Sequence, residues 1–403
     1  MNSFQPKGYF PLFFIFMFER LYFYGVRALL ILFMLKYLLF STEKAGDLYG
    51  WYIGILGFSP ILGGLIADIW LGQRKTLIWS VVMAILGCVF LAASSLTSSV
   101  VMFYIALLLM VIGSMLFKPT IYTTLGNIYE KRNDPRRDGG FTLTLVAINI
   151  GAFLAPLICG ILGENIGWWL GFTIAGIFMA SILFLLKYTP EKIIKGKDPK
   201  ASYQNAIFIM LLVFLAVYLP YSIGEGAIDQ TSLAGIIVGS FMIPASWMQA
   251  ILLLPSFIFY LIFPWVWIKL AKMKIEPATM YKFVWGLAFL VVGIILFQVA
   301  LSGYQRSELA SLSIIGVISI AVALSEVLIG PIIISLITRI VPKKWANTFV
   351  GAWFTITRGI AVIISLSFSK FNVSLAPILI ISVVACGIIV LVLLRAPFRR
   401  WVR

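Results

Sequence analysis

The chain alternates long apolar stretches with short polar connections. About 20 apolar residues make one helix that crosses a bilayer, and twelve stretches of that kind are present. The longer ones would have to tilt or to protrude from the membrane. The predicted spans are 9–40, 47–70, 75–96, 100–128, 139–162, 168–187, 204–227, 243–270, 279–300, 311–340, 346–369 and 375–395.

The segment 188–202 is the longest strongly polar connection, and it divides the spans into two sets of six. We predict an N-terminal bundle at 1–187, a linker at 188–203 and a C-terminal bundle at 204–403. This arrangement resembles that of major facilitator transporters, whose halves rock about a central site. The expected fold class is therefore an all-α membrane protein with the major facilitator superfamily fold and 12 transmembrane helices in two six-helix bundles.

The composition agrees with a polytopic membrane protein. Hydrophobic residues make up 62% of the 403 positions and charged residues 11%, whereas soluble domains have about half and a quarter. The chain has no His, which excludes a histidine ligand or a histidine proton relay. The three Cys fall in predicted spans without metal-type spacing. We expect no metal and no cofactor. If the protein carries protons, they must bind to carboxylates, because there is no His.

The formal net charge of +16 is distributed unevenly among the connections. Of the 31 Lys and Arg residues, 23 fall on one side of the predicted membrane and four on the other, and four lie within spans. The positive-inside rule then places both termini and every basic loop in the cytoplasm. The charge therefore indicates topology, and we expect no nucleic-acid partner. The expected location is the cytoplasmic (inner) membrane of a bacterium.

Five charges lie inside stretches that are otherwise apolar enough to span a bilayer. A charge at mid-membrane costs on the order of 3 kcal/mol, so these groups must pair across helices or line a wet cavity. Such residues usually mark the path of an ion or a solute. We therefore expect the protein to move something through a membrane. The five are Glu19, Arg20, Arg27, Lys118 and Glu326.

The connection between the second and third predicted spans carries a spaced motif, G-x-x-x-D-x-x-x-G-x-R-K, which is similar to a loop of the facilitator superfamily. We expect its first glycine to allow close helix approach and its cations to bridge to neighbouring helices. A plainer interpretation makes the two cations ordinary membrane-interface anchors. The motif residues are Gly64, Asp68, Gly72, Arg74 and Lys75.

The first span carries a second motif. At 100° per residue, Phe16, Arg20, Tyr24 and Arg27 fall on one face. The segment resembles E-x-x-E-R-x-x-Y-Y-G-x-R of the proton-dependent oligopeptide transporter (POT/PTR) family, of which the chain is identified as a divergent member. The alternative for the adjacent Glu19 and Arg20 is a local ion pair that only fixes the helix.

Further blocks follow in the family's order over about residues 9–354. Lys118 and Pro119 are similar to the family's F-K-P-N, residues 134–141 to D-P-R-R-D-x-G-F, and Asn149 to I-N-x-G. Looser matches occur in the second half: 243–249, 325–331, and 351–354 with Trp353.

The resemblance implies two alternating gates. Lys118 and Glu326 would close the inner side, and Arg27 with a carboxylate of the seventh span the outer side. We predict that Glu225 is the carboxylate of the outer gate, and Asp229 is the alternative. The role of Arg358 stays open between a structural pair and a substrate contact. The implied proton-coupling and gate residues are Glu19, Arg20, Arg27, Lys118, Glu225 and Glu326; the implied substrate-binding residues are Arg20, Tyr24, Arg27, Lys118, Asn149, Tyr221, Glu326 and Trp353.

The chain also departs from the family pattern. Phe16 replaces the first glutamate, Thr120 follows Lys118 and Pro119 in place of Asn, and Leu252 aligns with an asparagine of the amino-terminus clamp. Phe16 puts the usual proton coupling in question, and Leu252 the recognition of a free amino terminus.

The expected function is a proton-coupled symporter that imports di- or tripeptides, or a related small zwitterionic or anionic solute, by alternating access. Glu326 is the better candidate for carrying the proton. The alternatives are a same-fold transporter of a non-peptide substrate or an exporter, with altered or absent coupling, and a non-transporting receptor. An enzyme is not expected, because no cluster of His, Ser or paired acids with a nucleophile occurs. The expected partners are the solute, protons and the lipid bilayer, with the protein a monomer.

Overall fold

The computed structural model describes residues 5–129, 134, 136–189, 203–215, 237–238, 241–242, 245–273, 275, 277, 279–303 and 308–360. The chain divides into two compact units. The first unit comprises Met1–Lys200 and Ile337–Gly359, and the second Ala201–Leu336 and Ile360–Arg403.

The first unit is built from helices that follow the apolar stretches of the sequence. Serine hydroxyls begin two of them: Ser41 Oγ accepts from the Lys44 amide at 3.2 Å, and Ser99 Oγ from the Met102 amide at 3.4 Å, which satisfies N–H groups that lack a partner at a helix start. The helices are α1 Tyr9–Lys36, α2 Thr42–Phe58, α3 Pro60–Ile66, α4 Gln73–Thr97, α5 Val100–Asn127, α6 Arg137–Ala155, α7 Ile161–Asn165, α8 Trp168–Leu186 and α14 Ala346–Thr355.

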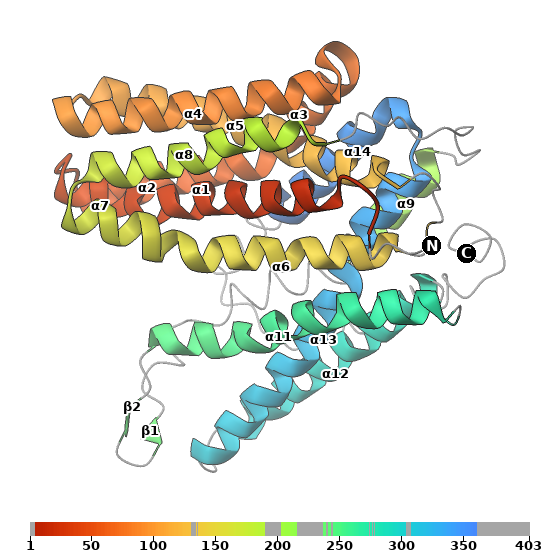
Figure 1. Ribbon diagram of the computed structural model, residues 1–403. Coiled ribbons are helices and arrows are strands. Elements are labelled where there is room, and N and C mark those ends of the chain that lie inside the picture. Colours follow the sequence, from red (N-terminus) through yellow and green to blue (C-terminus); the bar gives the residue numbers. More distant parts are fainter. Residues whose placement is uncertain are drawn as a thin grey trace. The chain divides into compact units, whose positions relative to one another are not determined.

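Helix α1 packs against α6 and α8, α4 packs against α5 and α8, and α3 packs against α5 and α14 (Figure 1). An aromatic cluster forms part of the core. The Phe33 ring stacks on Tyr37 at 5.1 Å and meets Phe103, Trp168 and Phe172 at 5.3–6.0 Å between centroids. Large apolar side chains on the outside of these helices, such as Leu108 and Ile177, are exposed, as lipid-facing positions are.

The predicted span 47–70 is bent. Helices α2 and α3, with the π-helical turn Ala67–Leu71, meet at 43° because Pro60 cannot continue the hydrogen-bond ladder of α2. Thr355 of α14 satisfies groups on both sides of the bend. Its hydroxyl donates to the Phe58 carbonyl at 3.1 Å and accepts from the Ile61 amide at 3.2 Å.

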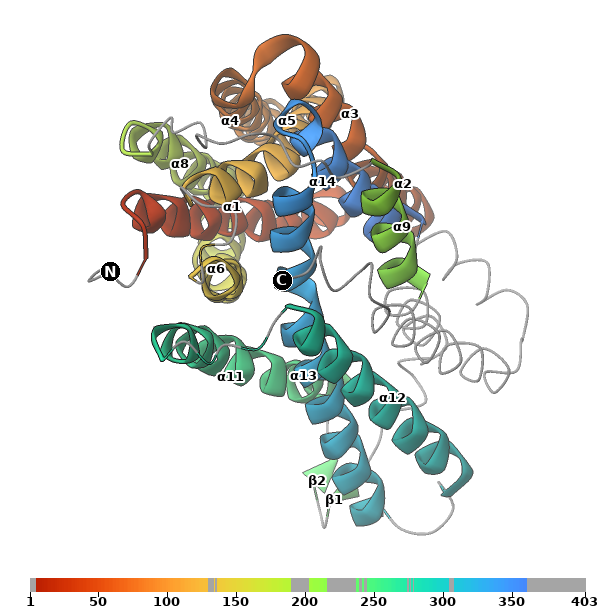
Figure 2. The same ribbon diagram turned by 90° about the vertical axis from the view of Figure 1, so that its right-hand side faces the viewer.

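The second unit contains α9 Tyr203–Val213, the two-residue strands β1 Ile237–Val238 and β2 Phe241–Met242, α11 Ala245–Lys272 and α12 Thr279–Gly303. The strands pair in antiparallel fashion, with Val238 opposite Phe241. Helix α13 Glu308–Ile340 runs beside α12 (Figure 2), and at Gly286 a side chain would clash with Ile329 and Leu328 of α13. The last turn of α13 belongs to the first unit, because that unit resumes at Ile337.

Within the described residues, five helices are long and apolar enough to cross a membrane, or six if the bent pair α2–α3 is one span. They are Gln73–Thr97, Val100–Asn127, Arg137–Asn165, Trp168–Leu186 and Ser319–Ile340. The count of twelve spans and the domain bounds 1–187, 188–203 and 204–403 stay predictions, since the predicted spans 204–227, 346–369 and 375–395 lie partly or wholly outside the described residues.

Candidate functional site

The pair Glu19 and Arg20 forms the charged centre of α1. Arg20 Nε and Nη2 donate to the two oxygens of Glu19, each at 2.5 Å, so the pair is bidentate. The side chains are 3% and 14% exposed. The local ion pair that the sequence offered as an alternative is therefore present, and it occupies both carboxylate oxygens.

Lys118 of α5 shares an aromatic ring with this pair. Its Nζ lies 5.4 Å from the centre of the Phe23 ring, and the Arg20 guanidinium lies 4.8 Å from the same centre. Arg20 also lies 5.8 Å from the Tyr24 ring, so the structure brings Arg20 and Tyr24 together as their spacing predicted. Such contacts offset part of the cost of placing a cation among apolar groups. Arg20 and Lys118 thus form one cationic cluster, and the rings of Phe23 and Tyr24 line it.

An aromatic row continues from this cationic cluster. The Phe16 ring lies 4.9 Å from the Tyr122 ring, and Tyr122 lies 5.2 Å from Phe354 of α14. Phe16 is 2% exposed. The position of α1 one turn before Arg20 is therefore filled by ring packing rather than by a charge.

Arg27 lies further along α1 and is exposed. Its Nε donates to the hydroxyl of Tyr49 on α2, and its guanidinium lies 5.7 Å from that ring. Its predicted partner Glu225, the rival Asp229 and the aromatic Tyr221 lie outside the described residues. The outer gate stays a prediction.

Asn149, Trp353 and Glu326 are placed within their own units. Asn149 Nδ2 donates to the Leu145 carbonyl of its own helix at 2.7 Å. Trp353 is 1% exposed. In the second unit, Ser256 donates to Glu326 Oε2 at 3.2 Å. Lys118 and Glu326 belong to different units, and their pairing as the inner gate stays a prediction, as do the substrate roles of all these residues.

Asp68 of the loop motif binds the start of α14. Oδ1 accepts from the Asn347 side chain at 2.6 Å and from its amide at 3.4 Å; Oδ2 accepts from the Thr348 amide and hydroxyl, both at 2.7 Å. The first amides of a helix lack intrahelical partners and carry its positive dipole end. A carboxylate is well suited to that position.

Two positions of the motif require glycine: Gly64 lies close to the backbone of α14, and Gly72 forms a turn with a positive φ. A Cβ on Gly64 would lie 2.4 Å from the Asn347 carbonyl oxygen, and Gly72 adopts a φ of 71°, which favours glycine. Arg74 Nη1 donates to the carbonyl of Thr189, which lies just after α8, at 3.2 Å. The role of Lys75 stays a prediction.

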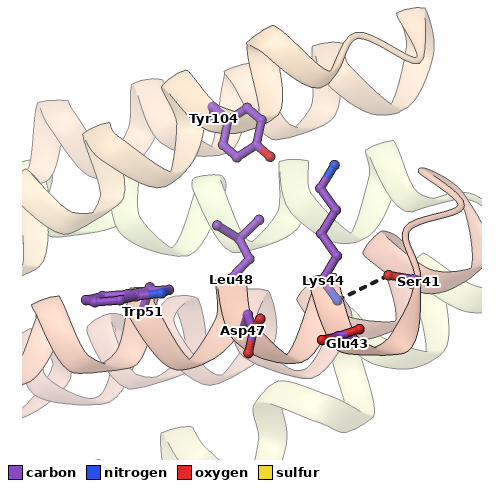
Figure 3. Close-up of a pocket in the computed structure, with 7 residues that line it drawn as sticks. All are labelled: Ser41, Glu43, Lys44, Asp47, Leu48, Trp51 and Tyr104. Carbon is purple, nitrogen blue, oxygen red and sulfur yellow. Dashed lines mark hydrogen bonds between the residues drawn. The ribbon is translucent and has the colours of Figure 1, made fainter.

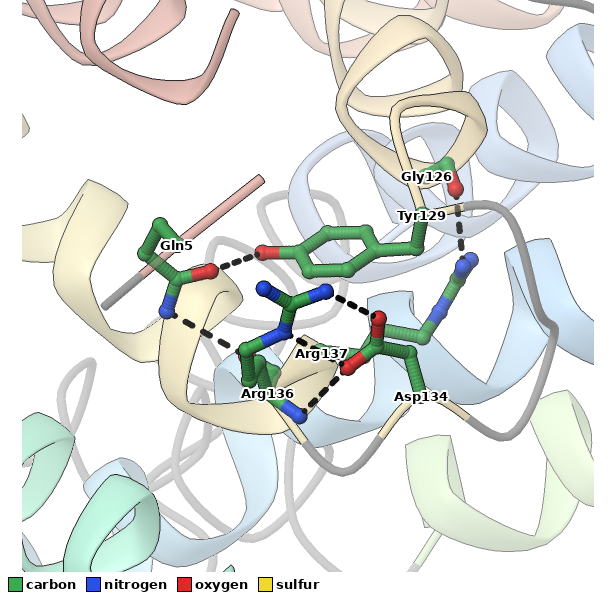
Figure 4. Close-up of polar contacts among 6 residues, drawn as sticks. All are labelled: Gln5, Gly126, Tyr129, Asp134, Arg136 and Arg137. Carbon is green, nitrogen blue, oxygen red and sulfur yellow. Dashed lines mark hydrogen bonds and ion pairs between the residues drawn. The ribbon is translucent and has the colours of Figure 1, made fainter. Parts of the chain in front are cut away.

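A polar cluster near the starts of α1 and α6 was not predicted as a site, although three of its residues, Asp134, Arg136 and Arg137, belong to the block 134–141 (Figure 4). Arg137 is 1% exposed; it donates to the Gly126 carbonyl at 2.7 Å and to Thr338 Oγ1 at 2.6 Å. The Tyr129 hydroxyl donates to Gln5 at 2.9 Å, and burial raises the pKa of Tyr129. Through its hydrogen bonds to Gly126 and Thr338, Arg137 links the end of α5 to the last turn of α13.

A shallow pocket lies where the start of α2 faces α5 (Figure 3). The exposed carboxylates Glu43 and Asp47 and the Trp51 ring, which is 73% exposed, line it together with Tyr104 of α5. Within the described residues, no group of three or more Cys, Asp or Glu side chains could hold a metal ion.

Comparison with known proteins connects these features. A model of the POT family matches residues 74–220. The peptide transporter YePEPT of Yersinia enterocolitica is 27% identical over 84% of this chain and 82% of its own length. The di-/tripeptide transporter of Lactococcus lactis is 27% identical over 87% and 86%. These matches support a relationship of the chain to the POT family.

The fold agrees with this relationship. A crystal structure of the peptide transporter POT in complex with alafosfalin matches 99% of this chain and 96% of its own, with a TM-score of 0.63 and 21% identity. The protein is thus an all-α, multi-pass integral membrane protein with the fold of the major facilitator superfamily, as the sequence predicted. Its relatives in the POT family are transporters.

Proposed function

We propose that this protein is a member of the POT family and a secondary active transporter for di- or tripeptides, or for a related small zwitterionic or anionic solute. It imports the solute together with protons by alternating access. The observation that carries the proposal is the cationic cluster within membrane helices, where Lys118 and the Glu19–Arg20 pair share the Phe23 ring. The relatives named for peptide transport support the peptide as substrate.

Lys118 supplies the group that attracts the solute. Within the described part of the first unit it contacts the Phe23 ring and forms no ion pair. An ammonium held among aromatic rings gains much from a carboxylate that arrives with the solute, because the two charges attract strongly where water is scarce. Arg20 holds its own carboxylate already, so it orients the cluster rather than binding alone.

Transport needs each side of the membrane to open in turn. We propose that Lys118 pairs with Glu326 when the inner side is closed, and Arg27 with Glu225 when the outer side is closed. A carboxylate released from its cation takes up a proton more readily, so Glu326 is the proposed proton carrier. The excess of Lys and Arg on one side of the membrane supports cytoplasmic termini in a bacterial inner membrane.

Uptake by proteoliposomes tests the proposal. Purified protein should accumulate a labelled dialanine when the lumen is alkaline, and Lys118→Ala should abolish accumulation while leaving the folded fraction unchanged. Glu326→Gln should retain exchange of internal for external peptide but lose accumulation driven by the pH gradient. Accumulation by Glu326→Gln under a pH gradient alone would contradict the coupling. Equal uptake without any gradient would favour a facilitator.

A non-peptide solute or an exporter on the same fold is the second candidate. Phe16 lies in an apolar row where the family motif has a glutamate, which favours altered coupling. Loading the vesicles with dialanine and measuring efflux distinguishes direction. A panel of organic anions offered in competition distinguishes solute class.

A further inference from the structure

The ring of Phe23 is the point at which cations from two helices meet. Arg20 lies one turn earlier on α1, with its guanidinium 4.8 Å from the centre of the ring, and Lys118 of α5 has its Nζ 5.4 Å from the same centre. Among the charged residues, Arg20 has the strongest electrostatic effect on the Lys118 ammonium. Like charges repel, so the electron-rich face of the ring offsets part of the cost of bringing the two cations together.

The Phe23 ring is itself held in place. It is 9% exposed, and the Tyr24 ring meets it edge to face, at 5.3 Å between centroids and an interplanar angle of 84°. A lysine ammonium, in contrast, lies at the end of a flexible four-carbon stem. The ring is therefore a fixed surface against which a mobile cation rests.

Resting on the proposed function, we infer that Phe23 is a positioning residue, whose ring holds the Lys118 ammonium where the solute carboxylate arrives. A cation that is already in place loses less conformational freedom when the solute binds, so the solute binds more tightly. Phe23 and Lys118 both belong to the first unit. Their contact therefore does not depend on whether Glu326 of the second unit or the solute supplies the carboxylate.

Substitution of Phe23 tests the role of the ring. Phe23→Leu removes the aromatic face, and it should raise KM for uptake of labelled dialanine by about tenfold, the factor to which about 1.4 kcal/mol corresponds, with a smaller change in kcat. Phe23→Tyr keeps the aromatic face and should have a KM close to that of the unaltered protein. Melting temperature in detergent shows whether each variant is folded.

Fluorinated phenylalanine at position 23 separates the charge of the ring from its shape. One, two or three fluorine atoms withdraw progressively more electron density from the face of the ring and change its size little, so KM should rise with each fluorine. The control is the same series at Phe33, a ring of α1 that is 0% exposed and packs among other aromatic rings. Fluorine at Phe33 should leave KM unchanged.

Fluorine NMR supplies a readout that does not require transport. With one fluorine on the Phe23 ring, Lys118→Met should shift the resonance, because the charge beside the ring is lost. The same substitution should leave the resonance of a fluorinated Phe33 in place.

The outcomes distinguish the positioning role from the proposed function. A KM that does not follow the number of fluorine atoms on Phe23, in a protein that takes up dialanine, would overturn the positioning role and leave peptide transport standing. If the unaltered protein takes up no dialanine, the proposed function fails, and the NMR measurement decides alone. A shifted Phe23 resonance would then support the positioning of Lys118, and an unshifted one would overturn it.

Discussion

Glu19 and Asp68 are two carboxylates of the same unit that satisfy their oxygens in different ways. Glu19 is 3% exposed and binds the adjacent Arg20 on its own helix. Asp68 accepts four hydrogen bonds from Asn347 and Thr348, about 280 residues away in sequence. The first carboxylate is held by a partner on its own helix, whereas the second is held by a helix that is distant in the sequence.

The difference separates a fixed charge from a releasable contact. Movement of one helix relative to another does not separate Glu19 from Arg20, because both lie on α1. The contact between Asp68 and α14 uses neutral donors, and water can replace those at modest cost because the groups are hydrogen-bonded in either state. A transporter needs both kinds of contact, one to hold a site and one to break.

The largest effect is expected from Glu19→Gln, which leaves the Arg20 charge without its carboxylate. Breaking a buried ion pair by removing one partner costs about 3–5 kcal/mol, so the melting temperature in detergent and the transport rate should both fall. The double variant Glu19→Gln with Arg20→Gln removes the uncompensated charge and should recover much of the melting temperature without recovering transport. Equal melting temperatures for the single variant and the unaltered protein would show that the pair is not buried as described.

A smaller effect is expected from Asp68→Asn. The amide group that replaces one oxygen would face donors of Asn347 and Thr348 instead of accepting from them, at a cost of about 1–3 kcal/mol per group left unsatisfied. Because the contact is releasable, the transport rate should fall more than the melting temperature. Asp47→Asn, on the exposed start of α2, is the matched control and should change neither. If Asp68→Asn lowers the melting temperature but not the transport rate, the contact between Asp68 and α14 does not need to open during transport.

Thr338→Val should have a still smaller effect, because it removes a single hydrogen bond, the one that Arg137 donates to Thr338. A hydrogen bond from a charged group is worth about 1.5–3 kcal/mol, so its loss should be visible as a lower midpoint in chemical denaturation. Thr338→Ser retains the hydroxyl and should behave like the unaltered protein. If Thr338→Val is as stable as the unaltered protein, the hydrogen bond between Thr338 and Arg137 contributes nothing to stability.

The smallest effect is expected from Tyr49→Phe. It removes the acceptor of Arg27 but leaves the ring beneath the guanidinium. Since Arg27 is exposed, water replaces the hydroxyl and the loss should stay below about 1 kcal/mol. Melting temperature should therefore be unchanged within error, while uptake reports whether the orientation of Arg27 matters for transport.

Features determined by local pattern could be predicted from the sequence. The spacing of Arg20 and Tyr24 placed them on one face, and their contact agrees. The glycine at position 72 was expected in a loop motif, and its φ of 71° is a backbone requirement that a glycine in the motif reveals. The long apolar runs predicted the helices, except that Pro60 bends the second span.

Contacts between distant segments could not be predicted in the same way. Nothing in the composition of the chain marks Asn347 and Thr348 as partners of Asp68, because hydrogen-bonding residues at a helix start are common and carry no record of what they bind. Arg137 was counted as a basic residue of a connection, yet it is 1% exposed and spans from Gly126 to Thr338. A block of charged residues next to a span does not reveal which of them points inward.

The hydrogen bonds of the Thr355 hydroxyl constrain the order in which the protein folds. It completes the hydrogen bonds of Phe58 and Ile61 on both sides of the bend in the second span, and 294 residues separate it from Ile61. Chains are made from the N-terminus, and early domains usually fold first. Here the second span enters the membrane with an open carbonyl and an open amide, which are costly to leave without partners in lipid. The first unit can therefore reach its final form only after almost the whole chain has been synthesised.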